Sequence, residues 1–305
     1  MDSRVAVVVP CFNDGAYVEQ AVASVREDEP VELVVVDDGS SDPATLSVLD
    51  ELRARDIRVI RRENGGLAAA RMTGVHATSA PYVLPLDSDD ALEPGALGRL
   101  ADVLDADASV AFVYGHLVFT GDKAGGRLAQ PWSPFTLLYA NRWGASCLFR
   151  REALLAAGGW SLGDIYEDWD LLMGLAEAGY AGAPVDQLVL HYRRHPSVRM
   201  NQTGHGRHAE LYKLLRSRHE ALFARRASLA RLERVPRWRR LVYPLLLGAR
   251  PLYPFRIYYA IENVRSREAN RRRAAAAETR IRRTAEGPSM APPRMDANSP
   301  SDSQP

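Results

Sequence analysis

Short apolar runs alternate with amphipathic segments through residues 5–114. The apolar runs are rich in valine and isoleucine and predict buried strands at residues 5–9, 31–36, 57–60, 82–86 and 110–114. The segments between them repeat apolar residues every three or four positions and predict helices at residues 14–26, 42–55, 66–78 and 94–105. Strands that are apolar throughout and alternate with helices are typical of a mostly parallel sheet covered on both faces. We therefore expect an α/β fold.

The pattern is less regular in the rest of the chain. Residues 120–135 are rich in Gly, Pro and basic residues and indicate a loop. Further strands are expected at residues 145–149 and 185–192, and further helices at residues 151–157, 167–178, 206–226 and 266–283. The composition predicts a first domain at residues 1–206, a basic and mainly helical extension at 207–283, and a disordered tail at 284–305.

The 305 residues carry a net charge of +1, but the two signs are separated along the chain. Residues 1–206 contain 17 Lys and Arg against 29 Asp and Glu, a net charge of −12. Residues 207–283 contain 21 Lys and Arg against 6 Glu, a net charge of +15. This split indicates an acidic, catalytic front and a basic rear that meets an anionic partner. The aromatic and arginine residues of 234–259 either pack on the first domain or dock on anionic lipid headgroups. No nucleic-acid-binding module is recognisable, so nucleic acid is not expected as a partner.

The two cysteines, Cys11 and Cys147, lie in apolar stretches and predict buried free thiols in a reducing compartment. The apolar run near the N-terminus is too short for a signal peptide, and charged residues and prolines interrupt the best transmembrane candidate at 241–261. We therefore expect a cytoplasmic protein that associates peripherally with the inner face of the cell membrane.

Three acidic clusters mark where chemistry is expected. Asp37 and Asp38 end the second predicted strand, Asp87, Asp89 and Asp90 follow the fourth, and Glu167 with Asp168 opens a later helix. Ligands of open α/β sheets bind beyond the carboxyl ends of the strands, so these clusters can converge on one crevice. Carboxylates alone are hard oxygen ligands that suit Mg²⁺ or Mn²⁺ rather than zinc. A divalent ion shared with substrate phosphates would offset the repulsion among the three aspartates that follow the fourth strand.

Five motifs occur in an order that resembles the family 2 glycosyltransferases with a GT-A fold. They are "VVVPCFND" at 7–14, "VVVDDGSSD" at 34–42, "NGGLAAARMTGV" at 64–75, "LPLDSDD" at 84–90 and "YEDWDLLMGLAEAG" at 166–179. Each motif alone is weak, whereas five in order are specific. The resemblance covers roughly residues 4–200 and implies an inverting, metal-dependent enzyme that moves a sugar from a nucleotide-diphosphate donor to an acceptor hydroxyl.

The resemblance also implies the residues of the nucleotide pocket. Those that would shape its entrance are Pro10, Phe12 and Asn13, with Asn64, Gly65 and Gly66 in the loop before the third helix. Asp38 would accept a hydrogen bond from the nucleotide base, and Arg71 would be delivered to the same base.

The resemblance implies the reacting groups as well. In the D-x-D element Asp87-Ser88-Asp89, Asp87 would face the ribose and Asp89 would bind Mn²⁺ or Mg²⁺ on the diphosphate. Asp168 would be the general base, and His195, with Arg193 and Arg194 beside it, would help to close over the diphosphate. UDP is favoured as the nucleotide by family frequency alone. A glycan or lipid-linked glycan acceptor, in cell-envelope or other glycan synthesis, would suit the basic rear.

Other interpretations of the same residues stay open at this point. A haloacid-dehalogenase-type phosphatase would use Asp87 as its nucleophile, and a non-catalytic module would only bind nucleotide sugars or membrane. Glu167 and Asp168 could serve only the helix dipole, and Asp170 could be the base instead of Asp168. We assign Asp42 to helix capping and His191 to the end of a strand rather than to a metal.

Overall fold

The computed structural model describes residues 3–121, 125–144, 146–163, 165–194 and 205–247. These residues all belong to one unit that extends to Ile261. The predicted helix at 266–283 and the predicted tail at 284–305 lie outside the described residues.

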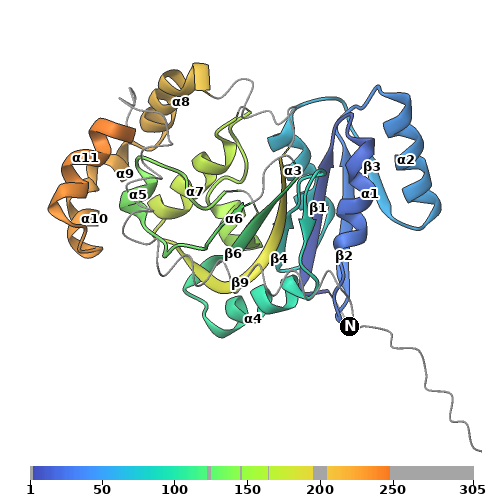
Figure 1. Ribbon diagram of the computed structural model, residues 1–305, viewed down its shortest axis with the longest axis horizontal. Helices are drawn as coiled ribbons and strands as arrows, with labels where there is room; N and C mark the ends of the chain where they lie inside the picture. The colour runs from blue at the N-terminus through green and yellow to red at the C-terminus, as the bar shows by residue number, and fades with distance from the viewer. Residues whose placement is uncertain (1–2, 122–124, 145, 164, 195–204, 248–305) are drawn as a thin grey trace, which may run out of the picture. The chain divides into compact units, whose positions relative to one another are not determined.

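The first four expected strands form the parallel half of a single sheet (Figure 1). β1 pairs in parallel with β2 on one side and with β4 on the other, and β3 pairs in parallel with β2. The strands are β1 (Val5–Cys11), β2 (Val31–Asp37), β3 (Arg58–Arg61) and β4 (Tyr82–Pro85). The helices that connect them in order are α1 (Gly15–Ser24), α2 (Pro43–Ala54) and α3 (Leu67–Ala77).

The second half of the sheet is mixed. Its order continues from β4 through β8, β6 and β9 to β5, and β7 pairs with β6. β6 and β9 are parallel to each other, whereas β8 is antiparallel to both β4 and β6. The strands are β5 (Ala91–Leu92), β6 (Val110–Gly121), β7 (Gly125–Arg127), β8 (Leu148–Arg150) and β9 (Ala181–Arg194).

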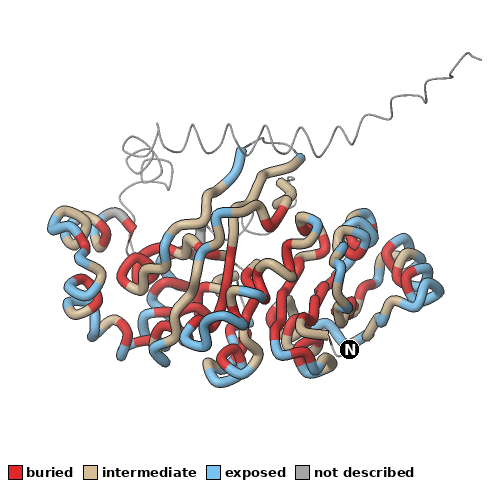
Figure 2. Tube along the Cα trace, turned by 90° about the horizontal axis from the view of Figure 1, so that it is seen from below, coloured by how far each residue is buried: buried red, intermediate tan, exposed pale blue. Residues whose placement is uncertain are grey.

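The sheet separates two hydrophobic cores, and β1 contributes alternate residues to them. Val5, Val7 and Val9 pack with α1, α2 and α4 (Ala96–Ala106), whereas Ala6 and Val8 pack with α3 and the helices that follow β8. All five side chains are buried, as expected for a central strand covered on both faces. Figure 2 shows buried residues gathered along the central strands and exposed residues along the outer helices.

The helices that follow β7 in the chain cover the face of the sheet opposite α4. α5 (Pro134–Leu137), α6 (Arg151–Ala156) and α7 (Glu167–Glu177) share the core that contains Ala6 and Val8. Four further helices join this core through Tyr212, Leu215, Leu222, Leu229 and Tyr243. They are α8 (His205–Arg218), α9 (Glu220–Ala224), α10 (Arg226–Leu232) and α11 (Arg237–Leu247). Residues 207–247 of the predicted basic extension therefore pack into the same core as β1 and α3.

Several local predictions are confirmed. Asp42 caps α2, accepting a 2.8 Å hydrogen bond from the backbone N of Thr45, with Pro43 at the first helical position. Cys11 and Cys147 are free and buried, and His191 lies in β9, where its Nε2 is 2.9 Å from Glu93. Apart from these predictions, no helix in the described part of the chain combines the length and the apolar character that a membrane span requires, and the candidate at 241–261 lies outside the described residues from position 248 onwards.

The loop prediction at 120–135 is correct only in part. Residues 125–127 form β7, and Pro134 begins α5, where the Ser133 side chain accepts a hydrogen bond from the backbone of Thr136. The sequence pattern did not predict β7, because two of its three residues are glycines, which disfavour a strand unless a neighbouring strand pairs with them. It also missed α11, which contains Pro244.

Gly74 allows α3 to pack closely on β1. A Cβ atom at this position would lie 2.2 Å from Cγ1 of Val8, closer than real carbon atoms approach one another. The glycine stands three residues after Arg71 on the same helix, so the close approach helps to set where α3 delivers the Arg71 side chain.

Candidate active site

The acidic clusters of β2 and β4 lie at one edge of the sheet. Both strands run parallel to β1, so their carboxyl ends, which precede Asp38 and Asp87, point the same way. The backbone N of Asp38 donates 2.9 Å to the carbonyl of Cys11 at the end of β1. Such an edge is where ligands of open α/β sheets bind.

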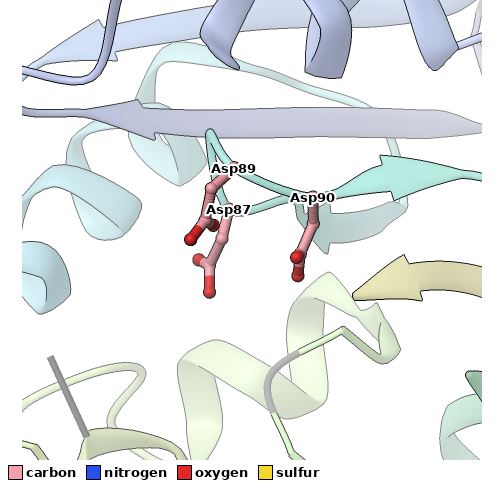
Figure 3. Close-up of side chains that lie close together, drawn as sticks. All are labelled: Asp87, Asp89 and Asp90. Carbon is pink, nitrogen blue, oxygen red and sulfur yellow. The ribbon is translucent and has the colours of Figure 1, made fainter. Parts of the chain in front are cut away.

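The turn after β4 gathers three carboxylates. Oxygen atoms of Asp87, Asp89 and Asp90 all lie within 4.8 Å of one another, and Figure 3 shows the three side chains pointing to the same side of the turn. Ser88 points elsewhere, because its Oγ donates a 2.5 Å hydrogen bond to Asp14, the residue that precedes α1. This bond joins the D-x-D turn to the start of α1.

Asp90 is the buried member of this cluster. Its Oδ1 accepts a 2.8 Å hydrogen bond from the backbone N of Arg193, and its Oδ2 is buried without a hydrogen-bond partner among the described residues. Burial, together with the nearby charges of Asp87 and Asp89, raises the pKa of Asp90 well above its usual range. An unpaired buried carboxylate oxygen is costly unless a cation or a proton compensates it.

The cluster fits a divalent cation of the hard type. All of its donors are carboxylate oxygens, the ligands preferred by Mg²⁺ and Mn²⁺, and the unpartnered oxygen of Asp90 belongs to the same cluster. The side chains of Asp87 and Asp89 are partly exposed, so a ligand can reach them.

Arg71 connects the D-x-D turn with the start of α7. Its Nη2 donates a 2.7 Å hydrogen bond to Asp87, while its Nη1 donates to Asp168 at 2.8 Å and to Glu167 at 3.1 Å. The guanidinium is buried and stands 5.5 Å from the centre of the Trp160 ring. The resemblance assigned Arg71 to the nucleotide base, whereas its hydrogen bonds in the structure are to these three carboxylates.

Asp168 is reachable and held in place. Its side chain keeps 20% of its surface exposed, against 7% for Glu167. Its Oδ1 also accepts a 3.1 Å hydrogen bond from the indole nitrogen of Trp160. Burial raises the pKa of Asp168 above its usual value, although the charge of Arg71 opposes the shift. A carboxylate that is ordered, accessible and more basic than usual has the properties of a general base.

Asp170, the alternative base, faces a different part of the molecule. It is buried and accepts hydrogen bonds from Arg218 Nε at 2.7 Å and from His219 Nε2 at 3.0 Å. Burial alone would raise the pKa of Asp170, but the hydrogen bonds from His219 and Arg218 outweigh it and lower the pKa. Asp170 therefore ties α7 to the end of α8, which favours Asp168 as the base.

Asp38 organises the loop before α3. Its two oxygens accept hydrogen bonds from Arg62 at 2.6 Å and from the backbone N atoms of Gly65 at 3.1 Å and Gly66 at 2.8 Å. Gly66 has a φ of +86°, which a residue with a side chain rarely adopts. Arg62 was not predicted as a site residue, although its place directly after β3 was a usable signal.

The remaining predicted pocket residues surround the same edge. Asn13 accepts hydrogen bonds from the backbone N atoms of Ser41 at 2.8 Å and Asp42 at 2.9 Å, and so ties the end of β1 to the turn after β2. Pro10 lies in β1, and Phe12 is 44% exposed beside Asn13. Asn64 is exposed in the loop before α3. No ligand contact is assigned to these four residues by the geometry alone.

The end of β9 reaches the D-x-D turn. Arg193 donates from Nε to the carbonyl of Asp89 at 2.9 Å and stacks 4.7 Å from the ring centre of Tyr17. Arg194 stands 4.6 Å from the ring centre of Phe119. His195 lies outside the described residues, so its predicted role at the diphosphate stays a prediction.

The chain resembles known glycosyltransferases in sequence. Residues 6–154 match the model of glycosyl transferase family 2. Glycosyltransferase GlyA of Streptococcus pneumoniae serotype 4 (strain ATCC BAA-334 / TIGR4) is 38% identical over 97 residues, which are 30% of this chain and 14% of that protein. Minor teichoic acid biosynthesis protein GgaA of Bacillus subtilis (strain 168) is 30% identical over 130 residues, 40% of this chain and 29% of that protein. The chain thus spans less than a third of the length of either relative.

Solved structures share the fold. TarS 1-349 of S. aureus, in complex with UDP-GlcNAc, superposes with a TM-score of 0.58 at 19% identity, covering 70% of this chain and 66% of that chain. Mannosyltransferase PcManGT from Pyrobaculum calidifontis, in complex with GDP-Man and Mn²⁺, superposes with a TM-score of 0.50 at 21% identity, covering 65% and 59% of the two chains. The sequence match shows that residues 6–154 resemble glycosyl transferase family 2, and the superpositions show that the chain shares the GT-A fold of these structures.

Proposed function

We propose that the protein is an inverting, metal-dependent glycosyltransferase that moves a sugar from a nucleotide-diphosphate donor to an acceptor hydroxyl. The observation that carries this proposal is the position of Asp168, which shares the guanidinium of Arg71 with Asp87 of the D-x-D turn. The proposed base and the proposed diphosphate site are therefore one side chain apart, as a single displacement requires.

The proposed reaction uses these residues in one step. Asp168 accepts the proton of the acceptor hydroxyl while the oxygen of that hydroxyl attacks the anomeric carbon. The bond from that carbon to the diphosphate breaks at the same time. The nucleoside diphosphate leaves with the electron pair, and attack from the opposite face inverts the anomeric configuration. When bound, Mn²⁺ or Mg²⁺ would neutralise charge on the leaving diphosphate, with Asp89 as its ligand and Asp87 facing the ribose.

Arg71 keeps these acids in register before substrate arrives. It is buried, so its charge acts on Asp168 and Asp87 with little screening by water. The indole nitrogen of Trp160 donates a second hydrogen bond to the same oxygen of Asp168. We infer that Asp38 and the loop that it holds form the floor of the nucleotide pocket, with Asn13 and Phe12 at its rim.

We propose a UDP-sugar as donor and a glycan or lipid-linked glycan as acceptor, at the cytoplasmic side of the cell membrane. The proposal is supported by UDP-GlcNAc in the TarS complex and by the role of GgaA in teichoic acid biosynthesis. GDP-Man in the PcManGT complex makes GDP-sugars the alternative donors to test.

Release of free nucleotide tests the proposal. The full chain is incubated with UDP- and GDP-sugars in the presence of Mn²⁺, Mg²⁺ or a chelator, and nucleoside diphosphate is measured. We expect release from one donor class only, dependent on the metal and lost in Asp89→Ala. Asp102→Ala is the matched control, because Asp102 is an exposed acid on α4, away from the turn.

Two outcomes would contradict the proposal. Full activity in Asp89→Ala would remove Asp89 from the mechanism. Release of inorganic phosphate that is abolished by Asp87→Asn would indicate a phosphatase with Asp87 as nucleophile.

A further inference from the structure

α11 presents an apolar stripe to solvent. Leu241 is 70% exposed and Leu245 is 62% exposed, and the exposed Arg237 precedes them at the same four-residue spacing. Residues four apart lie on one helix face. The other face is anchored, because Tyr243 and Leu247 are 2% and 3% exposed and belong to the core. We call the exposed residues Arg237, Leu241 and Leu245 the α11 face.

The exposure is concentrated in this part of the molecule. Among the large hydrophobic side chains that the structure describes, Leu232, Leu241 and Leu245 are the three most exposed. Leu232 ends α10, and the other two lie on α11. Figure 1 places both helices at the opposite end of the described chain from α2. Adjacent exposed leucines on a firmly packed helix are typical of a surface that contacts a partner.

The four helices α8 to α11, to which the α11 face belongs, are rich in basic residues. Residues 205–247 contain 11 Lys and Arg against 3 Glu, and no acidic residue occurs between Arg234 and Ile261. Two of the three glutamates have partners within the protein. Glu210 pairs with Arg207, and Glu233 accepts a 2.7 Å hydrogen bond from the backbone N of Phe135. A partner for this face must therefore combine an apolar interior with negative charge at its surface.

We propose that the α11 face docks on an anionic lipid bilayer, with Leu241 and Leu245 at the boundary of the acyl chains and Arg237 among the headgroups. A bilayer offers this combination of apolar depth and anionic surface. The C-terminal sequence does not suit the same position, because residues 248–283 carry 10 Arg against 3 Glu and would be repelled by the arginines there. The surface goes beyond the proposed transferase activity and does not depend on it.

Vesicle sedimentation tests the proposal with the full chain. We expect binding to phosphatidylcholine vesicles that contain phosphatidylglycerol, and little binding to pure phosphatidylcholine. The double variant Leu241→Glu/Leu245→Glu should reduce partitioning by about tenfold or more, since two leucines no longer insert and two charges oppose the headgroups. The matched control is Leu155→Glu/Leu214→Glu, which changes charge equally at leucines on α6 and α8 that are 41% and 40% exposed.

Each alternative has its own result. Unchanged binding by Leu241→Glu/Leu245→Glu would assign membrane adsorption to the basic C-terminal sequence and overturn the proposal. A wild-type dimer that this variant converts to monomers, measured by light scattering, would identify a second copy as the occupant and would equally overturn it. The circular dichroism melting curve and nucleotide release of the variant should match the wild type, because neither leucine is in the candidate active site.

Discussion

Arg71 and Asp168 share a 2.8 Å hydrogen bond between α3 and the start of α7, 97 residues apart in sequence. The guanidinium is 1% exposed and pairs with Asp87, Glu167 and Asp168. One buried cation thus faces three acids. Burial and the charge of Asp168 raise the pKa of Glu167 well above its usual range, although Arg71 opposes the shift. Burial thus favours the protonated form of Glu167.

Replacing Arg71 with methionine should destabilise the fold as well as stop turnover. Removing one partner of a buried charge network leaves the others uncompensated and costs about 3–5 kcal/mol. Urea denaturation of Arg71→Met should show this loss. The exposed Arg53→Met, which removes only a surface pair with Asp50, should change stability by less than about 1 kcal/mol. Equal stability of Arg71→Met and wild type would show that the network contributes nothing to folding.

Neutralising Asp168 and Asp170 separately should give opposite results. Asp168→Asn should lower the rate of sugar transfer by about 100- to 10,000-fold, the usual contribution of a general base. It should cost less stability than Arg71→Met, because Arg71 keeps Asp87 and Glu167 as partners. Asp170→Asn should lower stability by about 3 kcal/mol, the low end for a broken buried pair, because Arg218 is partly exposed. Steady-state kinetics and thermal melts of the two variants distinguish the roles. If Asp170→Asn were stable and inactive, Asp170 would be the better candidate for the base.

His219 should make stability depend on pH. Burial disfavours its charged form, but hydrogen bonds to Asp170 and Glu177 outweigh this and raise the pKa of His219. A raised pKa stabilises the fold fully below the unfolded pKa of about 6.5, and this contribution is lost as pH rises through the folded pKa. The free energy of unfolding of the wild type should therefore exceed that of His219→Gln most clearly at acidic pH. The difference should shrink towards alkaline pH.

Asp170 limits the same effect on the acid side. Burial opposes the effect of the hydrogen bonds from His219 and Arg218, but these bonds prevail and lower the pKa of Asp170. The contribution of Asp170 to stability is therefore present above its unfolded pKa of about 3.9, and it is lost as pH falls through the folded pKa. The comparison of wild type with His219→Gln is best made by urea denaturation at pH values between the titration of Asp170 and the titration of His219. A difference that is constant across the pH range would show that His219 does not titrate in the folded state.

Gly74→Ala should destabilise the protein although alanine favours helices. The gain in helix propensity is about 1 kcal/mol at most, whereas forcing a methyl group into a packed core costs about 1–3 kcal/mol. The steric cost exceeds the gain in helix propensity because the new Cβ would lie 2.2 Å from Val8. Val8 belongs to the central strand β1 and cannot move away. Urea denaturation should show a net loss of stability in Gly74→Ala and no change in Gly163→Ala, where a new Cβ would meet no atom within 4 Å apart from its chain neighbours.

The sequence by itself determined the front half of the fold and the location of its acids. The apolar runs of β1 and β2 are long and rich in valine, and the short run of β4 is apolar throughout, so burial on both faces of a parallel sheet was the stable solution. Parallel pairing then brings the residues after these strands, Asp38 and Asp87, to one edge, whatever the details of packing. Asp42 with Pro43 fixed the start of α2 through purely local chemistry.

Only the tertiary structure decided which acids work together. Nothing local separates Asp168 from Asp170, since both open the same helix; their difference arises because one faces Arg71 and the other faces Arg218 and His219. The guanidinium of Arg71 binds carboxylates and does not face an open pocket, because a buried charge needs partners of opposite sign nearby. Arg71 and Asp168 are 97 residues apart, so their pairing depends on how α3 and α7 pack. The pattern of residues along the chain does not predict that packing.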